Sequence, residues 1–465
     1  MKRNLFLLWV LGCLFNACSE GNEDAPAQPI EPDKPEQEEP EKPDPDTPDA
    51  LTATFPDDFT PEWVQSVAGK VVTLSNPLFV TETYGGSAPK GSVVLSSEVK
   101  RVFTEVNRPS TIAYPTWVEK HQTDRLTLSS EFPLVDADRT LRVGTELTQL
   151  KGTVSYAKGR YTLTLTEAPQ CRHQSRTLAP TVKDYNLKVM SFNAEHYYLY
   201  GKTEQPERQR QHAKILAALK EAQADVYALC EIEQGDFTVN YLCEDLNRAV
   251  GEERYAWLTT PGQPSKQTQV CAFLYDQTRV QPYLDFHSYD FDNLRMRFVA
   301  QCFELQENGA RVILTMNHLK AKDSKNDLKD GQGGSSARRL KEARFCLKTY
   351  RELTETCGDE DVLILGDLNS YSMEDPIQEF LAAGYTNQLK KHAPDRWSYV
   401  YRGEVGYLDH SLSSATLSSQ VVGASPWDIN ASEPAYFGFE VPDFFQADPY
   451  RSSDHNPILT WLNLK

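Results

Sequence analysis

The C-terminal part of the chain, from about residue 185 to residue 465, alternates two hydrophobic patterns. Short and almost continuous apolar runs such as VMSFNAEHY, DVYALCEIE, RVILTMNHLK and DVLILGDLN are typical of buried strands. Between them, residues 204–224 and 335–356 place apolar side chains at helical spacing, and the second segment begins with serines that suit a helix N-cap. Strands that alternate with helices predict an α/β fold, and we expect two packed sheets with the helices outside.

The preceding part of the chain has a different pattern. Residues 51–170 contain many short runs rich in β-branched residues, separated by turn glycines, with almost no helical periodicity. The hairpin pattern TVSYAKGRYTLTL at residues 153–165 is the clearest of these runs. We therefore predict a small all-β domain, followed by a polar linker at residues 171–184 and by a second domain at residues 185–465.

The first eighteen residues have the pattern of an export signal. Lys2 and Arg3 provide a positive start, and residues 5–14 form an apolar stretch that is too short to span a membrane. The string LFNAC that follows places small Ala17 before Cys18 and resembles a bacterial lipoprotein signal. We expect Cys18 to carry a lipid anchor in the mature chain. The alternative is an ordinary cleaved signal with an incidental cysteine.

The next segment, residues 19–50, is expected to form a disordered tether. Between residues 20 and 49 it contains twelve acidic residues, two lysines and eight prolines, so it cannot bury apolar surface. The formal net charge of the whole chain is −18, of which −10 lies in this tether. The remaining charge, near −8, is still acidic and argues against a protein that coats nucleic acid nonspecifically, although a local basic groove is compatible with it.

Polar side chains follow the buried runs where candidate strands end. GDLNS places Asp367 and Asn369 after one run, and SDHNP places Asp454 and His455 before another. Carboxylates bind Mg²⁺, and an imidazole exchanges a proton with a phosphate oxygen. These residue types at strand ends therefore indicate a metal-dependent phosphodiesterase or phosphatase.

Four further strings extend this set: VMSFNAEHY with Asn193, DVYALCEIE with Glu231, RVILTMNHLK with Asn317, His318 and Lys320, and GYLDHSLSS with Asp409 and His410. In this order, one at each strand end, the strings resemble those of the endonuclease/exonuclease/phosphatase superfamily over residues 185–465. The resemblance implies a four-layer α/β sandwich. It also favours an OB-like (oligonucleotide/oligosaccharide-binding) barrel over a plain β-sandwich spacer for residues 51–170.

The resemblance also implies a role for each residue of the set. Asn193, Glu231 and Asp454 are the expected metal ligands for Mg²⁺ or Mn²⁺, with Glu233 the alternative to Glu231. The expected catalytic residues are His318, Asp367, Asn369, Asp409 and His455. Lys320 is an expected phosphate contact, and so are Arg295 and Arg297 in the string LRMRF, for which the alternative is that they are solvated charges on a strand.

Three positions stay open at this point. His318 lacks the glutamate partner found in the pancreatic-enzyme pattern, and Gln269 lies near that place in the sequence, which favours phosphate binding over general-acid chemistry. His410 has either a site role or a structural one. The string DGQG at residues 330–333 resembles one in the secreted-nuclease branch of the superfamily, where glycines before a helix offer backbone N–H groups to a phosphate.

The sequence thus predicts a monomeric nuclease that cleaves DNA or RNA phosphodiesters by in-line attack of water. Its lipid anchor is expected to hold it at the bacterial outer membrane, where it faces either the periplasm or the cell surface. One alternative is a phosphatase or phospholipase of the same superfamily, acting on inositol phosphates or sphingomyelin. Another is a non-catalytic surface lipoprotein that binds its ligand.

Overall fold

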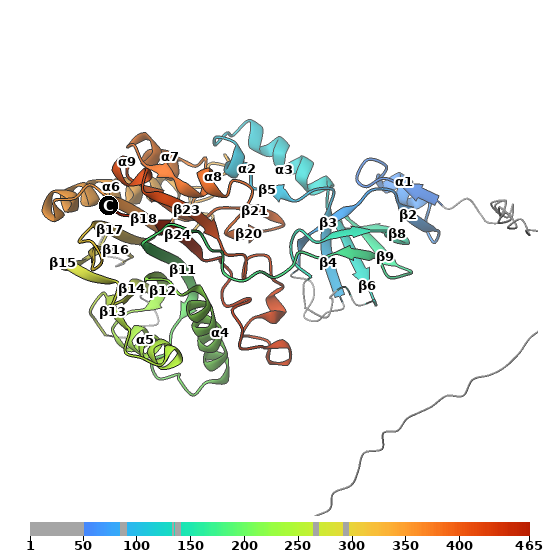
Figure 1. Ribbon diagram of the computed structural model, residues 1–465. Coiled ribbons are helices and arrows are strands. Elements are labelled where there is room, and N and C mark those ends of the chain that lie inside the picture. The colour runs from blue at the N-terminus through green and yellow to red at the C-terminus, as the bar shows by residue number, and fades with distance from the viewer. Residues whose placement is uncertain (1–50, 84–90, 133, 135–140, 264–268, 292–296) are drawn as a thin grey trace, which may run out of the picture. The chain divides into compact units, whose positions relative to one another are not determined.

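A computed structural model describes residues 51–83, 91–132, 134, 141–263, 269–291 and 297–465 (Figure 1). The expected export signal, Cys18 and the tether lie outside the described residues, as does Arg295. Residues Ala50–Lys465 form one compact unit. Within the part of the chain that is described, no helix is both long enough and apolar enough to cross a membrane.

Two six-stranded sheets form the C-terminal part of this unit. The first has the strand order β13-β14-β12-β11-β24-β23, and the second has the order β15-β16-β17-β18-β22-β19. The strands of the first sheet are β11 (Leu187–Tyr197), β12 (Val226–Glu233), β13 (Tyr255–Thr259), β14 (Gln269–Asp276), β23 (Val421–Pro426) and β24 (Ile458–Leu462). The strands of the second sheet are β15 (Val280–Tyr289), β16 (Phe298–Leu305), β17 (Arg311–His318), β18 (Val362–Asp367), β19 (Thr386–Asn387) and β22 (Asp409–Ser413).

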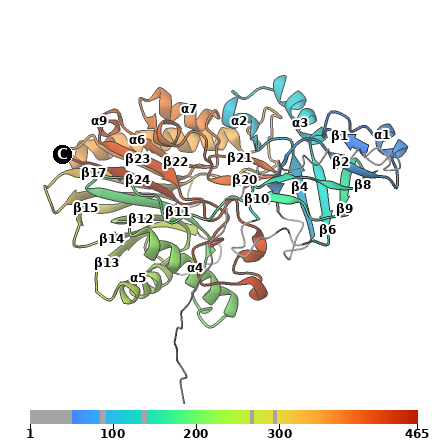
Figure 2. The same ribbon diagram turned by 45° about the vertical axis from the view of Figure 1, so that its right-hand side comes forward.

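The sheets pack face to face, and helices cover their outer faces (Figures 1 and 2). Val189 and Val226 of the first sheet share one buried cluster with Leu314 and Leu363 of the second. The longer helices are α4 (Pro206–Ala222) and α5 (Phe237–Val250) on the first sheet, and α6 (Ser336–Cys357) and α7 (Asp375–Ala382) on the second. Shorter helices are α8 (Gln388–His392), α9 (Ala415–Ser418), η1 (Ala435–Phe437) and η2 (Pro442–Phe444). The predicted α/β fold with two sheets and outer helices is confirmed.

The strands form where the sequence is apolar on both faces. Every residue of β18 is buried, because Leu363 and Leu365 face the other sheet while Ile364 faces α6 and α7. Full burial of one such side chain contributes about 1.5–3 kcal/mol. Polar Asp367 therefore comes at the only kind of position that tolerates it, the end of the strand.

The N-terminal part contains a nine-stranded mixed sheet with the order β1-β2-β8-β9-β6-β4-β3-β7-β10. Its strands are β1 (Leu51–Ala53), β2 (Val71–Leu74), β3 (Leu78–Glu82), β4 (Gly91–Ser96), β6 (Leu126–Ser130), β7 (Glu146–Thr148), β8 (Lys151–Ala157), β9 (Arg160–Leu165) and β10 (Gln170–Arg172). The hairpin expected at residues 153–165 is present as β8 and β9. The expected five-stranded OB-like barrel is not confirmed.

This part is not all-β, contrary to expectation. It contains helices α1 (Pro61–Ser66), α2 (Phe103–Val106) and α3 (Ala113–Thr123). The helix α3 has no fully buried residue and a weak apolar stripe, so its sequence gave little periodic signal.

A third, small sheet joins the two parts. Its order is β20 (Tyr399–Tyr401), β21 (Glu404–Gly406) and β5 (Lys100–Arg101). Strand β5 comes from the N-terminal part and pairs in parallel with β21 of the C-terminal part, with Glu404 opposite Lys100 and Val405 opposite Arg101. The N-terminal part is therefore built into the second part through backbone pairing.

Candidate active site

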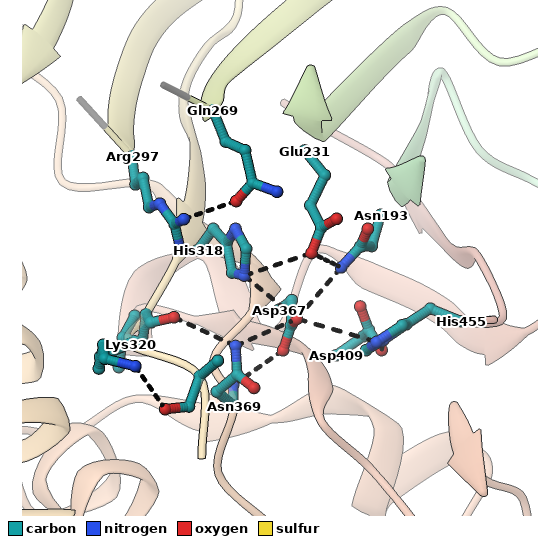
Figure 3. Close-up of polar contacts among 12 residues, drawn as sticks. Asn193, Glu231, Gln269, Arg297, His318, Lys320, Asp367, Asn369, Asp409 and His455 are labelled. Atoms are coloured by element: carbon teal, nitrogen blue, oxygen red, sulfur yellow. Dashed lines mark hydrogen bonds and ion pairs between the residues drawn. The ribbon is translucent and has the colours of Figure 1, made fainter. Parts of the chain in front are cut away.

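The polar side chains that end the central strands of both sheets converge at one place (Figure 3). Strand β11 runs parallel to β12, and β17 runs parallel to β18, so each pair ends at the same edge of its sheet. The converging residues are Asn193 from β11, Glu231 from β12, His318 from β17, Asp367 from β18, Asp409 from β22 and His455 from the loop before β24. The structure thus brings together six of the residues that the sequence predicted.

Asp367 lies at the centre of this cluster. Its Oδ2 accepts a hydrogen bond from Asn193 Nδ2 at 3.2 Å. The same oxygen is 3.6 Å from His318 Nε2 and 3.9 Å from His455 Nε2. Burial raises the pKa of Asp367, with His455 opposing the shift and the carboxylates of Asp409 and Glu231 adding to it. A carboxylate with a raised pKa between two imidazoles is a suitable proton acceptor at neutral pH.

His455 is held by Asp409. Its Nδ1 donates to Asp409 Oδ2 at 2.8 Å, and both side chains are buried. Burial disfavours the charged imidazole, but the carboxylates of Asp409, Asp454 and Asp367 outweigh it and hold the pKa of His455 well above its ordinary value. Because Nδ1 is engaged, the proton on Nε2 points to the side of Asp367 and is available for donation.

Glu231 accepts from Asn193 Nδ2 at 3.2 Å through Oε1, which lies 3.7 Å from His318 Nε2. Its other oxygen accepts from the backbone N–H of His196 at 3.0 Å. Glu233 is instead buried away from the cluster, where it accepts from Leu199 N, Tyr200 N and Thr238 Oγ1 at 2.7 to 3.0 Å. The geometry therefore supports Glu231, and not Glu233, as the acid of the site.

Asn369 lies beside Asp367 in a tight turn with a positive φ of 47°. Its backbone N–H donates to Asp367 Oδ1 at 2.9 Å, and its Nδ2 donates to Leu319 O at 3.1 Å. The backbone bond, together with a bond from Asn369 Nδ2 to Asp367 Oδ2 at 3.2 Å, fixes the Asp367 carboxylate (Figure 3). The turn therefore places Asn369 directly beside the cluster.

Two groups of three acidic or imidazole side chains have ligand atoms within 4.8 Å of one another, counted over the described part of the chain. They are Glu231 with His318 and Asp367, and Asp367 with Asp409 and His455. Asp454 belongs to neither group, but burial together with the nearby Asp454 charge raises the pKa of Glu195. The structure therefore places Asp454 beside the cluster rather than in its centre.

A small cleft next to His318 is lined by several cationic side chains. Its lining consists of Phe291, Arg297, Phe298, His318, Lys320, Arg338 and Glu342. Arg297 is fixed by a hydrogen bond from its NH2 group to Gln269 Oε1 at 2.5 Å, and Lys320 Nζ is 3.4 Å from Asp323 Oδ2. Gln269, which the sequence placed near His318, thus holds the guanidinium of Arg297. Arg338 was not predicted.

The two remaining motifs have structural roles. His410 is fully buried, its Nε2 bonds to Ser370 O at 2.8 Å, and burial lowers the pKa of its imidazole. In the DGQG string the Asp330 carboxylate accepts from Gln332, while Gly331 packs against Phe103 of α2. The backbone N–H of Gly334, at the start of α6, donates to Asp323 O at 2.9 Å. The prediction that this loop cradles a phosphate is therefore not supported by its contacts.

Besides Arg338, two residues near the cluster were not predicted from the sequence. His196 Nδ1 lies 3.0 Å from Glu231 Oε2, and the Tyr399 ring lies against the His455 imidazole with 4.5 Å between centroids. Glu195 and His196 both have a positive φ, where the register between β11 and β12 shifts. His196 was inside a recognised string, whereas nothing local in the sequence signals Tyr399.

Residues 190–455 match the model of the Endonuclease/Exonuclease/phosphatase family. A comparison with curated proteins gave no match. Similar solved structures include the catalytic domain of human Nocturnin with a bound sulfate, which is 15% identical, with coverage of 60% of this chain and 94% of that one and a TM-score of 0.42. Another is TDP2 from D. rerio complexed with a single-strand DNA product, which is 18% identical, with coverage of 60% of this chain and 98% of that one and a TM-score of 0.41.

A third similar structure is a mannosyl-6-phosphatase from Bacteroides thetaiotaomicron, with 14% identity, coverage of 59% of this chain and 99% of that chain, and a TM-score of 0.42. The family match at residues 190–455 spans more than half of the chain, begins within β11 and ends at His455 in the loop before β24. It includes Asn193, Glu231, His318, Asp367 and His455. The chain therefore belongs to the Endonuclease/Exonuclease/phosphatase family.

Proposed function

We propose that this protein is a metal-dependent phosphoester hydrolase, and that its substrate is a nucleic acid. The observation that carries the proposal is the position of Asp367 Oδ2, which faces the Nε2 atoms of His318 and His455 at 3.6 and 3.9 Å. One proton acceptor between two imidazole groups suits attack of water on phosphorus, since the acceptor takes a proton while the imidazoles contact the phosphate oxygens.

The residues present fit a hard divalent cation. Among the described residues, the ion-pair partners of Glu231 and Asp367 are imidazoles, and neither acid pairs with a lysine or an arginine. We assign Mg²⁺ or Mn²⁺ to Glu231, with Asn193 and Asp454 completing its surroundings, because oxygen ligands and few protein carboxylates suit these ions. When bound, the cation stabilises negative charge on the phosphoryl oxygens.

The chain's own residues then have distinct tasks. Asp367 takes the proton of the attacking water, and Asn369 keeps the Asp367 carboxylate in place through its backbone N–H. His455, oriented by Asp409, donates from Nε2 to a phosphate oxygen. His318 contacts the phosphate from the side of the cationic cleft.

The cleft beside His318 supports a polymeric substrate. Arg297, Lys320 and Arg338 provide three cationic groups; Arg338 Nε donates to Glu342 Oε1 at 2.8 Å, and Lys320 Nζ lies 3.4 Å from Asp323 Oδ2. These groups suit the phosphates that flank the cleaved bond, and the ring of Phe291 at the same wall suits a base or sugar. The contacts of the DGQG loop give no separate support for a phosphate site, so the nuclease proposal is argued from this cleft.

The test compares four classes of substrate with the purified chain in Mg²⁺: supercoiled plasmid, single-stranded DNA or RNA, inositol phosphates and sphingomyelin. We expect nicking of the plasmid and cleavage of oligonucleotides, with both abolished in Asp367→Asn. Release of phosphate from inositol phosphates, or cleavage of sphingomyelin, without nucleic-acid cleavage would assign the alternative activities instead. Tight binding of a ligand without any hydrolysis would indicate a binding protein.

We also propose that Cys18 is lipidated, that the anchor holds the protein at the bacterial outer membrane, facing outward, and that it acts there as a monomer. The support is the sequence pattern of residues 1–18 and the long acidic tether that follows. The substitution Cys18→Ser should move the protein from the membrane to the soluble fraction. Retention in the membrane fraction would contradict the proposal, and light scattering of the detergent-solubilised protein gives the oligomeric state.

A further inference from the structure

A short segment of the N-terminal part enters the C-terminal part close to the candidate active site. Strand β5 is followed by Val102 and by α2, and Val102 packs with Tyr371 and Leu408 in one buried cluster. Thr104 and Glu105 of α2 are 0% and 1% exposed, although both are polar. A buried carboxylate must be matched by donors, so the partners of Glu105 show what the segment holds.

The Glu105 carboxylate bonds to two separate loops. Its Oε2 accepts from the backbone N–H of Ser372 at 3.3 Å and of Tyr407 at 3.1 Å. Its Oε1 accepts from Ser372 Oγ at 2.8 Å and from Lys390 Nζ. Ser372 follows Asp367 and Asn369 in the loop after β18, and Tyr407 precedes Asp409 at the start of β22. One carboxylate thus clamps the two segments that deliver the central acid and the partner of His455.

Hydrogen bonds of Thr104, and one between the two loops themselves, also hold these loops together. Thr104 Oγ1 donates to Glu374 Oε1 at 2.9 Å, and Thr104 O accepts from Met373 N at 2.9 Å, in the same loop as Ser372. Leu368 N donates to Leu408 O at 2.9 Å, so the two loops are also bonded directly to each other. Gly406 permits this arrangement, because a Cβ there would lie 2.6 Å from the Tyr371 ring and 3.3 Å from Glu105 Oε2.

We propose that Glu105 is a positioning residue of the active site, contributed by the N-terminal part, which holds Asp367 and Asp409 at their working separation. The proposal gives the N-terminal part a role in the rate of the reaction, beyond spacing or substrate capture. It rests on the proposed hydrolase function for its kinetic test. A small displacement of either loop changes the position of the proton acceptor, and displacements of this kind are costly for catalysis.

The experiment compares the whole chain with the variants Glu105→Gln and Glu105→Ala. The control is Glu119→Gln, which removes an exposed acid from α3 of the same part. We expect kcat to fall about threefold or more in Glu105→Gln and about tenfold or more in Glu105→Ala, with KM within about twofold of wild type, as for an interaction that affects the reacting state. The glutamine variant keeps more activity because its amide oxygen still accepts from a backbone N–H. The Glu119→Gln control should match wild type.

Amide hydrogen exchange provides a readout that does not depend on activity. Peptides covering residues 368–374 and 406–409 should exchange faster in Glu105→Gln, while strand β12 should be unchanged. If Glu105→Ala does not fold, Glu105→Gln decides: a kcat equal to that of wild type overturns the proposal, even if the melting temperature falls. If the wild-type chain hydrolyses no phosphoester, the proposed function fails, and unchanged exchange in both loops then overturns this inference separately.

Discussion

The contact between His455 and Asp409 leads to a quantitative prediction for the substitution Asp409→Asn. The asparagine has nearly the same shape, and the backbone N–H of residue 409 still donates to Ser398 Oγ, so the fold should be retained. What is lost is the charge that faces His455 Nδ1 at 2.8 Å, between side chains that are only 4% and 7% exposed. Solvent therefore screens this pair little, and its energy lies at the upper side of the range for hydrogen bonds.

A hydrogen bond to a charged group contributes about 1.5–3 kcal/mol, and about 1.4 kcal/mol corresponds to a tenfold change in rate. We therefore expect kcat to fall by about 10- to 150-fold in Asp409→Asn, with KM within about twofold, because the imidazole donates most strongly when negative charge develops on the phosphate. Steady-state hydrolysis of bis(p-nitrophenyl) phosphate and nicking of supercoiled plasmid both measure this loss.

The matched control is Asp276→Asn. Asp276 is also fully buried, and its Oδ2 accepts from Arg254 Nε at 2.6 Å, but it lies at the other end of β14 from Gln269. It should lower the melting temperature without lowering kcat. The reasoning is refuted if folded Asp409→Asn keeps kcat within threefold of wild type, or if Asp276→Asn lowers kcat as much.

Three further predictions follow from the site and its supports. Glu231→Gln should weaken Mn²⁺ binding measured by calorimetry. Glu233→Gln should instead leave Mn²⁺ affinity intact and lower the melting temperature, because the Glu233 carboxylate accepts hydrogen bonds from three buried donors. The reverse result would make Glu233 the metal ligand and Glu231 the structural acid. EDTA should abolish hydrolysis, with Mg²⁺ or Mn²⁺ restoring it and Zn²⁺ not required, and activity that survives chelation would remove the metal. Deleting residues 51–179 should lower kcat on short and long substrates alike, because the deletion removes Glu105; an unchanged kcat on a short oligonucleotide would show that residues 180–465 suffice.

The polar residues at the strand ends were predictable, because a charged side chain is disfavoured inside a buried apolar strand. Runs such as DVLILGDLN tolerate a carboxylate only where the strand leaves the core, which located Asp367 and Asn369 from the sequence. The hydrophobic pattern could not distinguish Glu231 from Glu233, because residues two apart point to the same side of a regular strand. The structure separates them because Glu231 has a φ of 59° and the register of β12 shifts between Leu229 and Ile232. The hydrophobic periodicity of the sequence does not reveal this irregularity of the strand.

Contacts between distant parts of the chain were not predictable in the same way. The sequence suggested that residues 51–170 form a separate all-β domain and that the DGQG loop meets a phosphate. The structure shows that this loop packs against Phe103 and that Ser372 and Tyr407 depend on Glu105. A buried glutamate in a four-residue helix has no local pattern that distinguishes it from a solvated acid, because its partners lie 267 and 302 positions away.

The pairing of early and late segments constrains how the chain folds during its synthesis. Strand β11 of the first C-terminal sheet lies between β12 and β24, and β24 is formed by Ile458–Leu462, much later in the chain. Glu105 likewise cannot form its hydrogen bond with Tyr407 until Tyr407 has been synthesised. At a synthesis rate of about 5–20 residues per second, this happens roughly 15–60 s after Glu105 is added to the chain. A chain that stops before residue 458 lacks strand β24, which pairs with the part of β11 that precedes Asn193, and therefore lacks one of the two neighbours of that strand.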